Sequence, residues 1–292
     1  MDRELLRAFV AVAETEGFSA AANMLNRTQS AVSLQIKRLE ERVGATLFFR
    51  TSRAVALTEK GARLLPFARQ LLHLEEQARA SIAPEPLREV IRFGLTEEHA
   101  TAYLPHILNV MARAHPGAQI RIVCGISSGL VQAFQDGKLD LVLAVRHQPI
   151  QTGRILGVEP MLWVAKEDFE APPHAPLPLV LNPEGCIFRA HALAAIGGAG
   201  RTWREPYVSG SPTGVNVAVQ SGLALTIKTP RSVPDGCVDI GDRLGLPQLG
   251  LAEIEMHVSP AHIGDAFQTL VQEVDQVCRE GTGPFPDIHG AS

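Results

Sequence analysis

The sequence contains no apolar run near the roughly 20 residues that a helix needs to cross a bilayer. Its first residues, Met1-Asp2-Arg3-Glu4, lack the basic-then-apolar pattern of a secretory signal. The four cysteines lie far apart and form no CxxC pair, which is typical of reduced thiols. These absences disfavour a membrane or a secreted protein. We therefore expect a cytoplasmic protein without a membrane partner.

Signatures of catalysis and metal binding are also missing. There is no GxGxxG and no GxxxxGK[ST] stretch, and no nucleophile–base pair suggests itself. His99, His106 and His115 are seven and nine residues apart and do not stack on one helical face, and Cys186 and His191 have no companion ligands. We expect no catalytic residue, no metal and no cofactor. Cys186 is either a redox-active thiol or a small buried residue.

Length and charge indicate two functional parts. The 292 residues are 46% apolar and 20% charged, which is typical of a globular chain of about two domains. The net charge is −4, yet residues 27–63 hold 8 basic and 3 acidic side chains. A basic segment in an acidic chain favours a nucleic-acid partner, although a solvated helix face gives the same pattern.

The first 58 residues have the pattern of a winged helix-turn-helix. Apolar spacing predicts helices over 4–13, 20–26 and 30–43, and the stretch 47–57 reads as a small β-hairpin. In such a domain the opening turns of the third helix face the base edges in the major groove. The alternatives are that Ser30 is only the helix N-cap and that the basic residues form a solvated face. The DNA-contacting candidates are Arg27, Gln29, Ser30, Ser33, Lys37, Arg38, Arg50 and Arg53.

A fourth helix over 59–82 should join the two parts, as a linker and dimerisation segment over 59–88. Its apolar positions follow a 4-3-4-3-4 spacing that resembles a coiled-coil seam, although Glu75 interrupts it. The predicted dimerisation residues are Leu64, Leu71, Ala78 and Ile82.

Alternating strands and helices begin at Val90, so the rest of the chain should be an α/β structure with mostly parallel sheets. The alternation stops at a proline-rich stretch, 172–178, and then restarts, which suggests two similar lobes. We place lobe I at 89–163 with 260–281, lobe II at 164–259, and a flexible tail at 282–292. Crossing strands near 160–166 and 254–260 should join the lobes.

Ligands of open α/β sheets bind beyond the carboxyl ends of the strands, often at helix N-termini. This rule predicts a cleft between the lobes that holds a small organic effector. Its hydroxyl and cationic side chains favour an anion, although Glu97 and Glu98 lie beside the same cleft. The alternative for the serines is an ordinary helix-capping role. The candidate cleft residues are Thr96, Ser127, Ser128, Arg146, Phe188, Arg189, Ser209 and Thr226.

Nearly sixty residues from "LLRAFVAVAETEGFSAAANMLN" to "LTEKG" carry a family resemblance. The Ala21-Ala22 pair, "QSAVSLQIKRLE", "LFFR" and "LTEKG" are similar to those of LysR-type transcriptional regulators. The resemblance implies an N-terminal winged helix-turn-helix, a dimerising linker helix and a two-lobed effector domain resembling type 2 periplasmic-binding proteins. It implies a sequence-specific regulator that binds duplex DNA as a homodimer or homotetramer. The alternative is a small-molecule binding protein or enzyme whose N-terminal helical module has a non-DNA role.

Overall fold

The computed structural model describes residues 2–50, 55–81, 89–147, 153–171 and 175–280. Its contacts divide the chain into two compact units. The N-terminal unit comprises Met1–Glu89, Ala133–Asp140 and Ser259–Gly264, and the C-terminal unit comprises Val90–Gln132, Leu141–Val258 and Asp265–Ser292. Within the described residues, no helix has both the length and the apolar character needed to cross a membrane.

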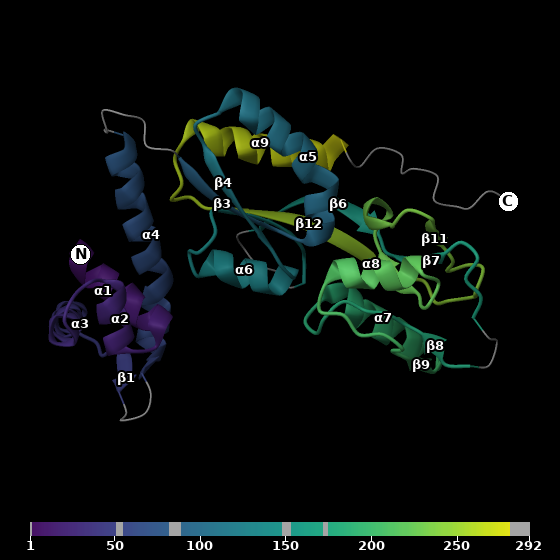
Figure 1. Ribbon diagram of the computed structural model, residues 1–292, viewed down its shortest axis with the longest axis horizontal. Helices are drawn as coiled ribbons and strands as arrows, with labels where there is room; N and C mark the ends of the chain where they lie inside the picture. The colour runs from purple at the N-terminus through teal and green to yellow at the C-terminus, as the bar shows by residue number, and fades with distance from the viewer. Residues whose placement is uncertain (1, 51–54, 82–88, 148–152, 172–174, 281–292) are drawn as a thin grey trace. The chain divides into compact units, whose positions relative to one another are not determined.

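The N-terminal unit is a winged helix-turn-helix followed by a long helix. Its elements are α1 (Arg3–Thr15), α2 (Phe18–Met24), α3 (Gln29–Val43), β1 (Phe48–Arg50), β2 (Val55–Leu57) and α4 (Glu59–Ser81). Strands β1 and β2 are antiparallel and form the wing (Figure 1). Phe9 of α1 and Phe48 of β1 meet in the core with ring centroids 5.4 Å apart, so the wing is anchored to the helices.

The start of α4 explains the "LTEKG" stretch. The Thr58 hydroxyl donates to the Thr46 carbonyl at 2.8 Å and accepts from the Gly61 amide at 3.0 Å, which joins the wing to the helix. Gly61 is needed for space, because a Cβ there would overlap the Leu47 carbonyl oxygen. The helix then continues through Pro66 to Ser81.

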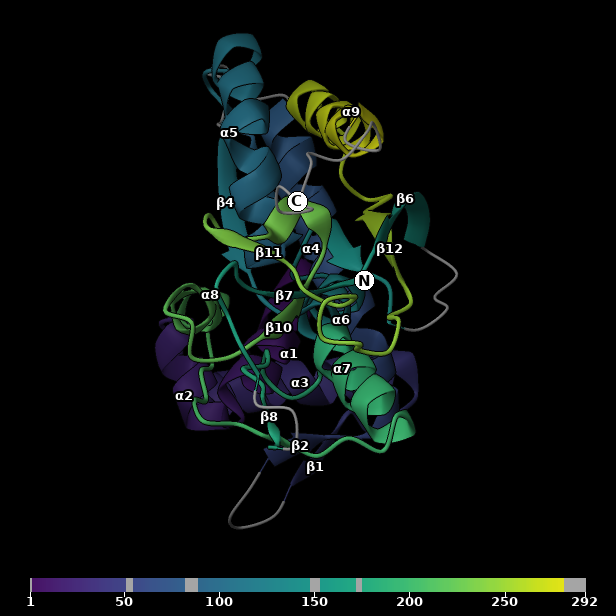
Figure 2. The same ribbon diagram turned by 90° about the vertical axis from the view of Figure 1, so that its right-hand side faces the viewer.

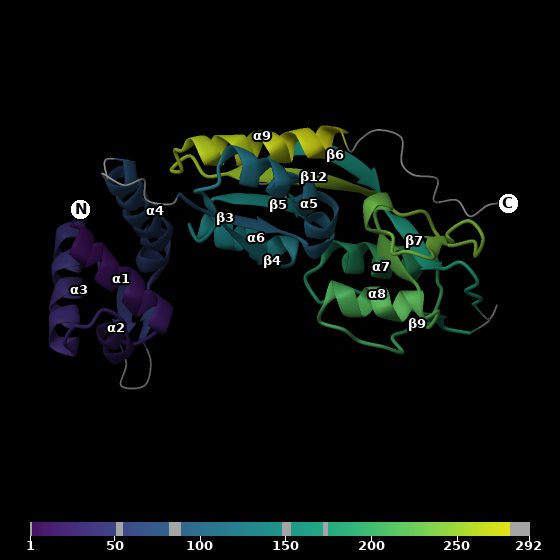
Figure 3. The same ribbon diagram turned by 45° about the horizontal axis from the view of Figure 1, so that its top comes forward.

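Lobe I of the C-terminal unit has a five-stranded sheet of order β4-β3-β5-β12-β6. Strands β3 (Val90–Leu95), β4 (Gln119–Cys124) and β5 (Leu141–Val145) are parallel, whereas β12 (Leu251–Val258) runs antiparallel to β5 and to β6 (Gly153–Pro160). Helices α5 (Glu97–Ala114) and α9 (Asp265–Glu280) cover one face of this sheet, and α6 (Ser127–Gln135) lies on the other (Figure 3).

Lobe II is built on β7 (Leu162–Lys166), which pairs antiparallel with β10 (Thr226–Lys228) and β11 (Cys237–Asp239). Strands β8 (Leu177–Pro178) and β9 (Trp203–Arg204) are parallel, and a Leu179–Leu225 bridge continues the sheet from β8. The 3-10 turn η1 (Pro230–Ser232) follows β10.

Successive residues of β7 explain why a helix covers each face of lobe II. Trp163 and Ala165 pack with α7 (Ile187–Gly198), and Val164 packs with α8 (Pro212–Gln220), as the period of two in a strand requires. Figure 2 shows α7 and α8 on either side of β7 and β10.

The predicted fold class is confirmed: a winged helix-turn-helix precedes a long helix and a two-lobed α/β part. Some segments differ in detail. The lobes are joined at the β6–β7 junction and just before β12, where the Met161 amide donates to the Gly250 carbonyl at 3.2 Å. Residues 251–258, within the range predicted for lobe II, form a strand of the lobe I sheet. The predicted tail over 282–292 and the linker residues 83–88 lie outside the described residues.

Candidate functional site

Helix α3 has one buried and one exposed face. Val32, Ile36 and Leu39 are buried in the N-terminal core. The other face carries two rows of residues four apart, which stack on a helix surface. These rows are Gln29, Ser33 and Lys37, and Ser30, Leu34 and Arg38, and all are exposed except the half-buried Ser33. The three polar candidates at the start of this helix, Gln29, Ser30 and Ser33, therefore share a surface with its two basic candidates, Lys37 and Arg38.

The start of α3 leaves its short polar side chains accessible. Thr28 is the N-cap, and its hydroxyl accepts from the Ala31 amide at 3.2 Å. The explanation of Ser30 as the N-cap is therefore wrong, because Ser30 lies inside the first turn, 3.1 Å from the Thr28 hydroxyl. Gln29 Nε2 donates to the Ser33 hydroxyl at 3.2 Å. Both hydrogen bonds are exposed on the surface, so contacts with a base edge can replace them.

The basic candidates are less uniform. Arg27 is exposed and lies 3.5 Å from Glu4, and Lys37 lies 4.0 Å from Glu41. Both ion pairs are solvated and therefore weak, so phosphate oxygens can replace these carboxylates. The side chain of Arg50 and all of Arg53 lie outside the described residues.

Leu34 is a residue of this surface that the sequence patterns did not single out. Its side chain is 48% exposed at the centre of the α3 face. An apolar side chain there can contact a thymine methyl group. The signal in the sequence is an apolar residue that falls between the buried positions Val32 and Ile36 and outside their helical spacing.

Helix α4 also presents an exposed apolar face. Phe67, Leu71 and Leu74 are 62%, 43% and 41% exposed, and Ala78 continues their 4-3-4 spacing. The predicted seam residue Leu64 instead packs against the core of its own domain, where Ala68 is fully buried. Ile82 lies outside the described residues.

Glu75, which interrupted the predicted seam, belongs to the side of α4 that faces its own domain. It pairs with Arg3 of α1 at 3.2 Å and with Arg79 at 3.0 Å. The exposed apolar face is therefore free of this carboxylate.

The C-terminal unit contains a cavity of about 230 Å³ at the strand ends of both lobes. The N-termini of α5, α6 and α7 contribute to its walls. It is lined by Thr96, Glu97, Glu98, Cys124, Gly125, Ile126, Ser127, Val145, Asn182, Pro183, Cys186, Ile187, Phe188, Gly210 and Pro212. At about 30 Å³ per water, it has room for roughly eight waters, which suits a small metabolite.

Three of the predicted cleft residues line this cavity: Thr96, Ser127 and Phe188. Thr96 caps α5 by accepting from the His99 amide at 3.3 Å, and the Ser127 hydroxyl accepts from the Val145 amide at 3.0 Å. The Thr96 hydroxyl therefore both caps its helix and lines the cavity, whereas the Ser127 hydroxyl lines the cavity and binds the end of β5.

Three other predicted residues are placed elsewhere. The Ser128 hydroxyl donates to the Gly185 carbonyl at 3.5 Å, and Ser209 donates to the Ser211 carbonyl at 3.0 Å. Thr226 is buried in the sheet, opposite Val164 of β7. None of the three is among the residues that line the cavity.

Both predicted cations, which also lie outside the cavity lining, are engaged by carboxylates. Arg189 donates to both oxygens of Glu205, at 2.7 and 3.0 Å, and this bidentate bond raises the pKa of the guanidinium. Arg146 donates to Glu253 at 3.1 Å. An anionic ligand would have to compete with these carboxylates.

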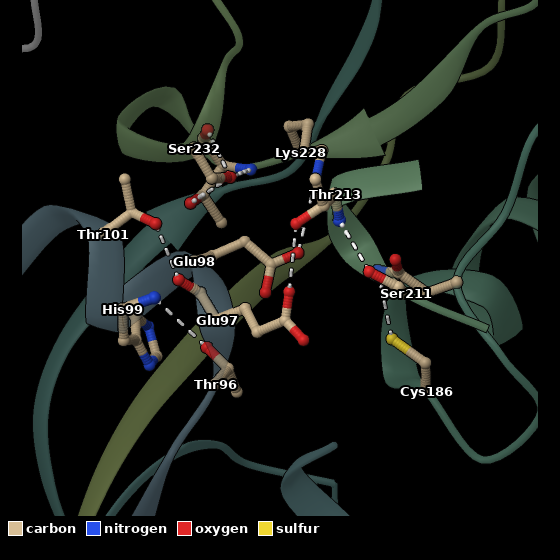
Figure 4. Close-up of polar contacts among 12 residues, drawn as sticks. Thr96, Glu97, Glu98, His99, Thr101, Cys186, Ser211, Thr213, Lys228 and Ser232 are labelled. Atoms are coloured by element: carbon tan, nitrogen blue, oxygen red, sulfur yellow. Dashed lines mark hydrogen bonds and ion pairs between the residues drawn. The ribbon is translucent and has the colours of Figure 1, made fainter. Parts of the chain in front are cut away.

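Acidic groups at the start of α5 face lobe II across the cavity edge (Figure 4). Glu98 accepts from the ammonium of Lys228 at 3.3 Å, and that ammonium is fully buried at the end of β10. The Glu97 carboxylate accepts from the Thr213 hydroxyl at 3.5 Å. The Glu98 carboxylate is therefore paired with a lysine of lobe II, whereas the Glu97 carboxylate lies at the cavity wall beside a hydroxyl.

Burial favours the neutral forms of two titratable side chains next to the cavity, Cys186 and His99. Burial raises the pKa of the Cys186 thiol, and hydrogen bonds from Arg189, Phe188 and Asn182 only partly oppose this effect. Burial also lowers the pKa of His99, against the nearby charges of Glu98 and Glu159. A thiol with a raised pKa is a poor redox sensor, which favours the structural interpretation of Cys186.

Comparisons with known proteins agree with this architecture. Residues 4–62 match the family described as bacterial regulatory helix-turn-helix protein, lysR family, and residues 84–262 match the LysR substrate binding domain. The chain is similar to the HTH-type transcriptional regulator PecT of Dickeya dadantii (strain 3937), with 32% identity over 96% of this chain and 88% of PecT. It is 33% identical to the HTH-type transcriptional regulator DgdR of Burkholderia cepacia, over 94% of each chain.

Among solved structures, ArgP from Mycobacterium tuberculosis has a similar fold. Its TM-score is 0.75 at 19% identity, over 98% of this chain and 99% of that chain. The two matched domains cover the exposed face of α3 and the cavity of the C-terminal unit, and the two relatives extend over nearly the whole sequence. The chain therefore belongs to the LysR family, and it is a DNA-binding transcriptional regulator with an effector-binding domain.

Proposed function

We propose that this regulator is controlled by a small zwitterionic metabolite, of about the size of an amino acid, bound in the cavity of the C-terminal unit. The observation that carries the proposal is the opposite polarity of two cavity walls. Glu97 contributes a carboxylate, and the first turn of α6 at Ser127 contributes backbone N–H groups that precede the helical ladder. An ammonium group suits the first wall and a carboxylate suits the second.

The cations support this choice over a simple anion. The expectation of an anionic ligand rested on hydroxyl side chains together with Arg189 and Arg146, and both arginines are paired with carboxylates and lie outside the cavity lining. Helix N-termini such as that of α6 remain at the cavity wall to bind an anion, and Glu97 would repel a ligand that carried only negative charge. A ligand with both charges satisfies both walls.

On the DNA side, we propose that the exposed face of α3 reads base edges and that the exposed face of α4 joins two copies of the chain. Two-fold assembly suits the family's helix-turn-helix, because a dimer presents two recognition helices to two half-sites. We further propose that the protein acts in the cytoplasm, where its DNA is, and that it has no enzymatic activity.

Replacing Glu97 by glutamine should weaken effector binding by about 10- to 100-fold, since a hydrogen bond to a charged group contributes about 1.5–3 kcal/mol. The effector is first found by thermal-shift screening of the full-length protein. The panel holds the common amino acids, the amines made by removing their carboxylate and the acids made by removing their amine. Titration calorimetry then compares wild type, Glu97→Gln and Asp168→Asn.

Asp168→Asn is the matched control, because it removes an exposed carboxylate at the far end of β7. It should bind the effector like wild type. A best ligand that lacked the amine, or a Glu97→Gln variant with unchanged affinity, would show that Glu97 does not select the ligand.

Replacing Gln29 by alanine should lower affinity for the preferred sequence by about 1–3 kcal/mol and relax the preference at one position per half-site, because a bidentate contact to adenine is lost. Lys37→Ala should weaken all sequences equally and reduce the salt slope by about one. Both are measured on duplexes selected from a random library. If Gln29→Ala kept the wild-type sequence preference, the N-terminal end of α3 would not contact the bases.

A further inference from the structure

We propose that the N-terminal unit contains a site for a divalent transition metal ion of the zinc type, with His73, Asp140 and His262 as ligands. His73 lies on α4, Asp140 directly precedes β5 and His262 follows β12 in the chain. One ligand atom from each of the three residues lies within 4.8 Å of the others. Two imidazoles and a carboxylate form a ligand set that suits zinc and related ions.

The distances fit a tetrahedral ion. His73 Nε2 lies 3.3 Å from His262 Nδ1 and 3.3 Å from Asp140 Oδ1, and His262 Nδ1 lies 3.6 Å from Asp140 Oδ2. Two ligands of a tetrahedral ion with bonds of about 2.0–2.1 Å are about 3.3–3.4 Å apart. The two histidine nitrogens are therefore already spaced like two ligands of such an ion. The Asp140 carboxylate places one oxygen near each of them, so it can supply the third ligand, and a water can complete the site.

The surroundings of His262 orient it as a ligand. Its Nε2 atom lies 3.1 Å from a carboxylate oxygen of Glu89. A carboxylate can only accept a hydrogen bond, so Glu89 favours the His262 tautomer with the proton on Nε2. The lone pair is then on Nδ1, and this atom faces the other two ligands. Metal-binding histidines in proteins typically have such a carboxylate behind them.

The backbone also holds the ligands in place. The Ser259 amide donates to the Asp140 carbonyl at 2.8 Å, which joins the two segments that carry Asp140 and His262. At Gly264, a Cβ would overlap the Glu89 carboxylate, so glycine leaves room for that group. Asp140 and His262 are buried, whereas His73 is half-buried and provides the side from which an ion can enter.

Metal binding is tested on the full-length protein after removal of ions with a chelator. We expect one tight Zn²⁺ per chain by calorimetry, and Co²⁺ should give the visible absorption of a tetrahedral nitrogen and oxygen site. His73→Ala should weaken Zn²⁺ binding at least about 100-fold, and Glu89→Gln by about 10- to 100-fold. His106→Ala, which changes an exposed histidine of α5, should bind like wild type.

Circular dichroism checks that each variant is folded. His73→Ala is the informative variant, because the His73 side chain is partly exposed, at 16%, whereas those of Asp140 and His262 are buried. The proposal is overturned if the wild type holds Zn²⁺ no more tightly than folded His73→Ala. It is also overturned if bound Co²⁺ shows thiolate charge-transfer bands, which would place the ion on the cysteines.

Discussion

Replacing Glu98 by glutamine will lower the free energy of unfolding of the C-terminal unit by about 3–5 kcal/mol. The reason is the fully buried ammonium of Lys228, which lies 3.3 Å from the Glu98 carboxylate and would lose its counter-charge. Lys228→Met should cost less, because the carboxylate that it leaves behind is 13% exposed and can reach water through the cavity. The double variant should recover most of the loss, since no unpaired buried charge remains.

The measurement is urea unfolding followed by tryptophan fluorescence. Both tryptophans, Trp163 and Trp203, belong to lobe II, and Trp163 lies on β7 beside the strand that carries Lys228. Lys166→Met is the matched control, because Lys166 forms an exposed pair with Asp168 on the same sheet and should change stability by less than about 1 kcal/mol. Equal losses in Glu98→Gln and in the control would show that the ion pair contributes little.

The winged helix-turn-helix could be predicted from the sequence, because each of its helices buries one periodic apolar stripe. Val32, Ile36 and Leu39 show that stripe in α3. The exposed face was harder to define, since a residue such as Leu34 carries no periodic signal. Its exposure follows from which side of α3 the first two helices cover, and that is a property of packing.

The face of α4 shows the same limit more clearly. Two sets of positions in α4 follow a 4-3 spacing, so periodicity alone cannot choose between them. The first set is 64, 68, 71, 75 and 78, and the second is 67, 71, 74 and 78. The contacts of Ala68 with the core and of Glu75 with Arg3 decide which side is turned inward.

The position of the cavity could be predicted from the sequence, but the pairing of the charged side chains around it could not. The rule that ligands bind beyond strand ends selected Thr96 and Ser127, and both line the cavity. It could not show that Arg189 pairs with Glu205 or that Lys228 reaches Glu98, because these partners come from other elements. The proposed metal ligands His73 and His262 are 189 residues apart, so no short spacing reveals them.

Replacing Leu71 by aspartate should separate the proposed dimer and lower affinity for a two-half-site operator by at least about 100-fold. Leu71 lies in the middle of the exposed face formed by Phe67, Leu71, Leu74 and Ala78, so the new carboxylate would be buried without a partner in the joined helices. A separated chain also loses the gain from binding two half-sites at once. Sedimentation measures the assembly, and a gel shift measures the affinity.

Leu71 belongs both to the exposed face and to the seam predicted from spacing, so a second variant is needed to tell which of the two forms the dimer contact. Leu74→Asp tests the exposed face alone and should act like Leu71→Asp. Glu76→Ala, an exposed change on the same helix outside both stripes, should leave mass and affinity unchanged. Because Leu71 and Leu74 are already exposed in the single chain, both aspartate variants should keep the wild-type fold. A Leu74→Asp protein that sediments and binds its operator like wild type would exclude this face as the dimer contact.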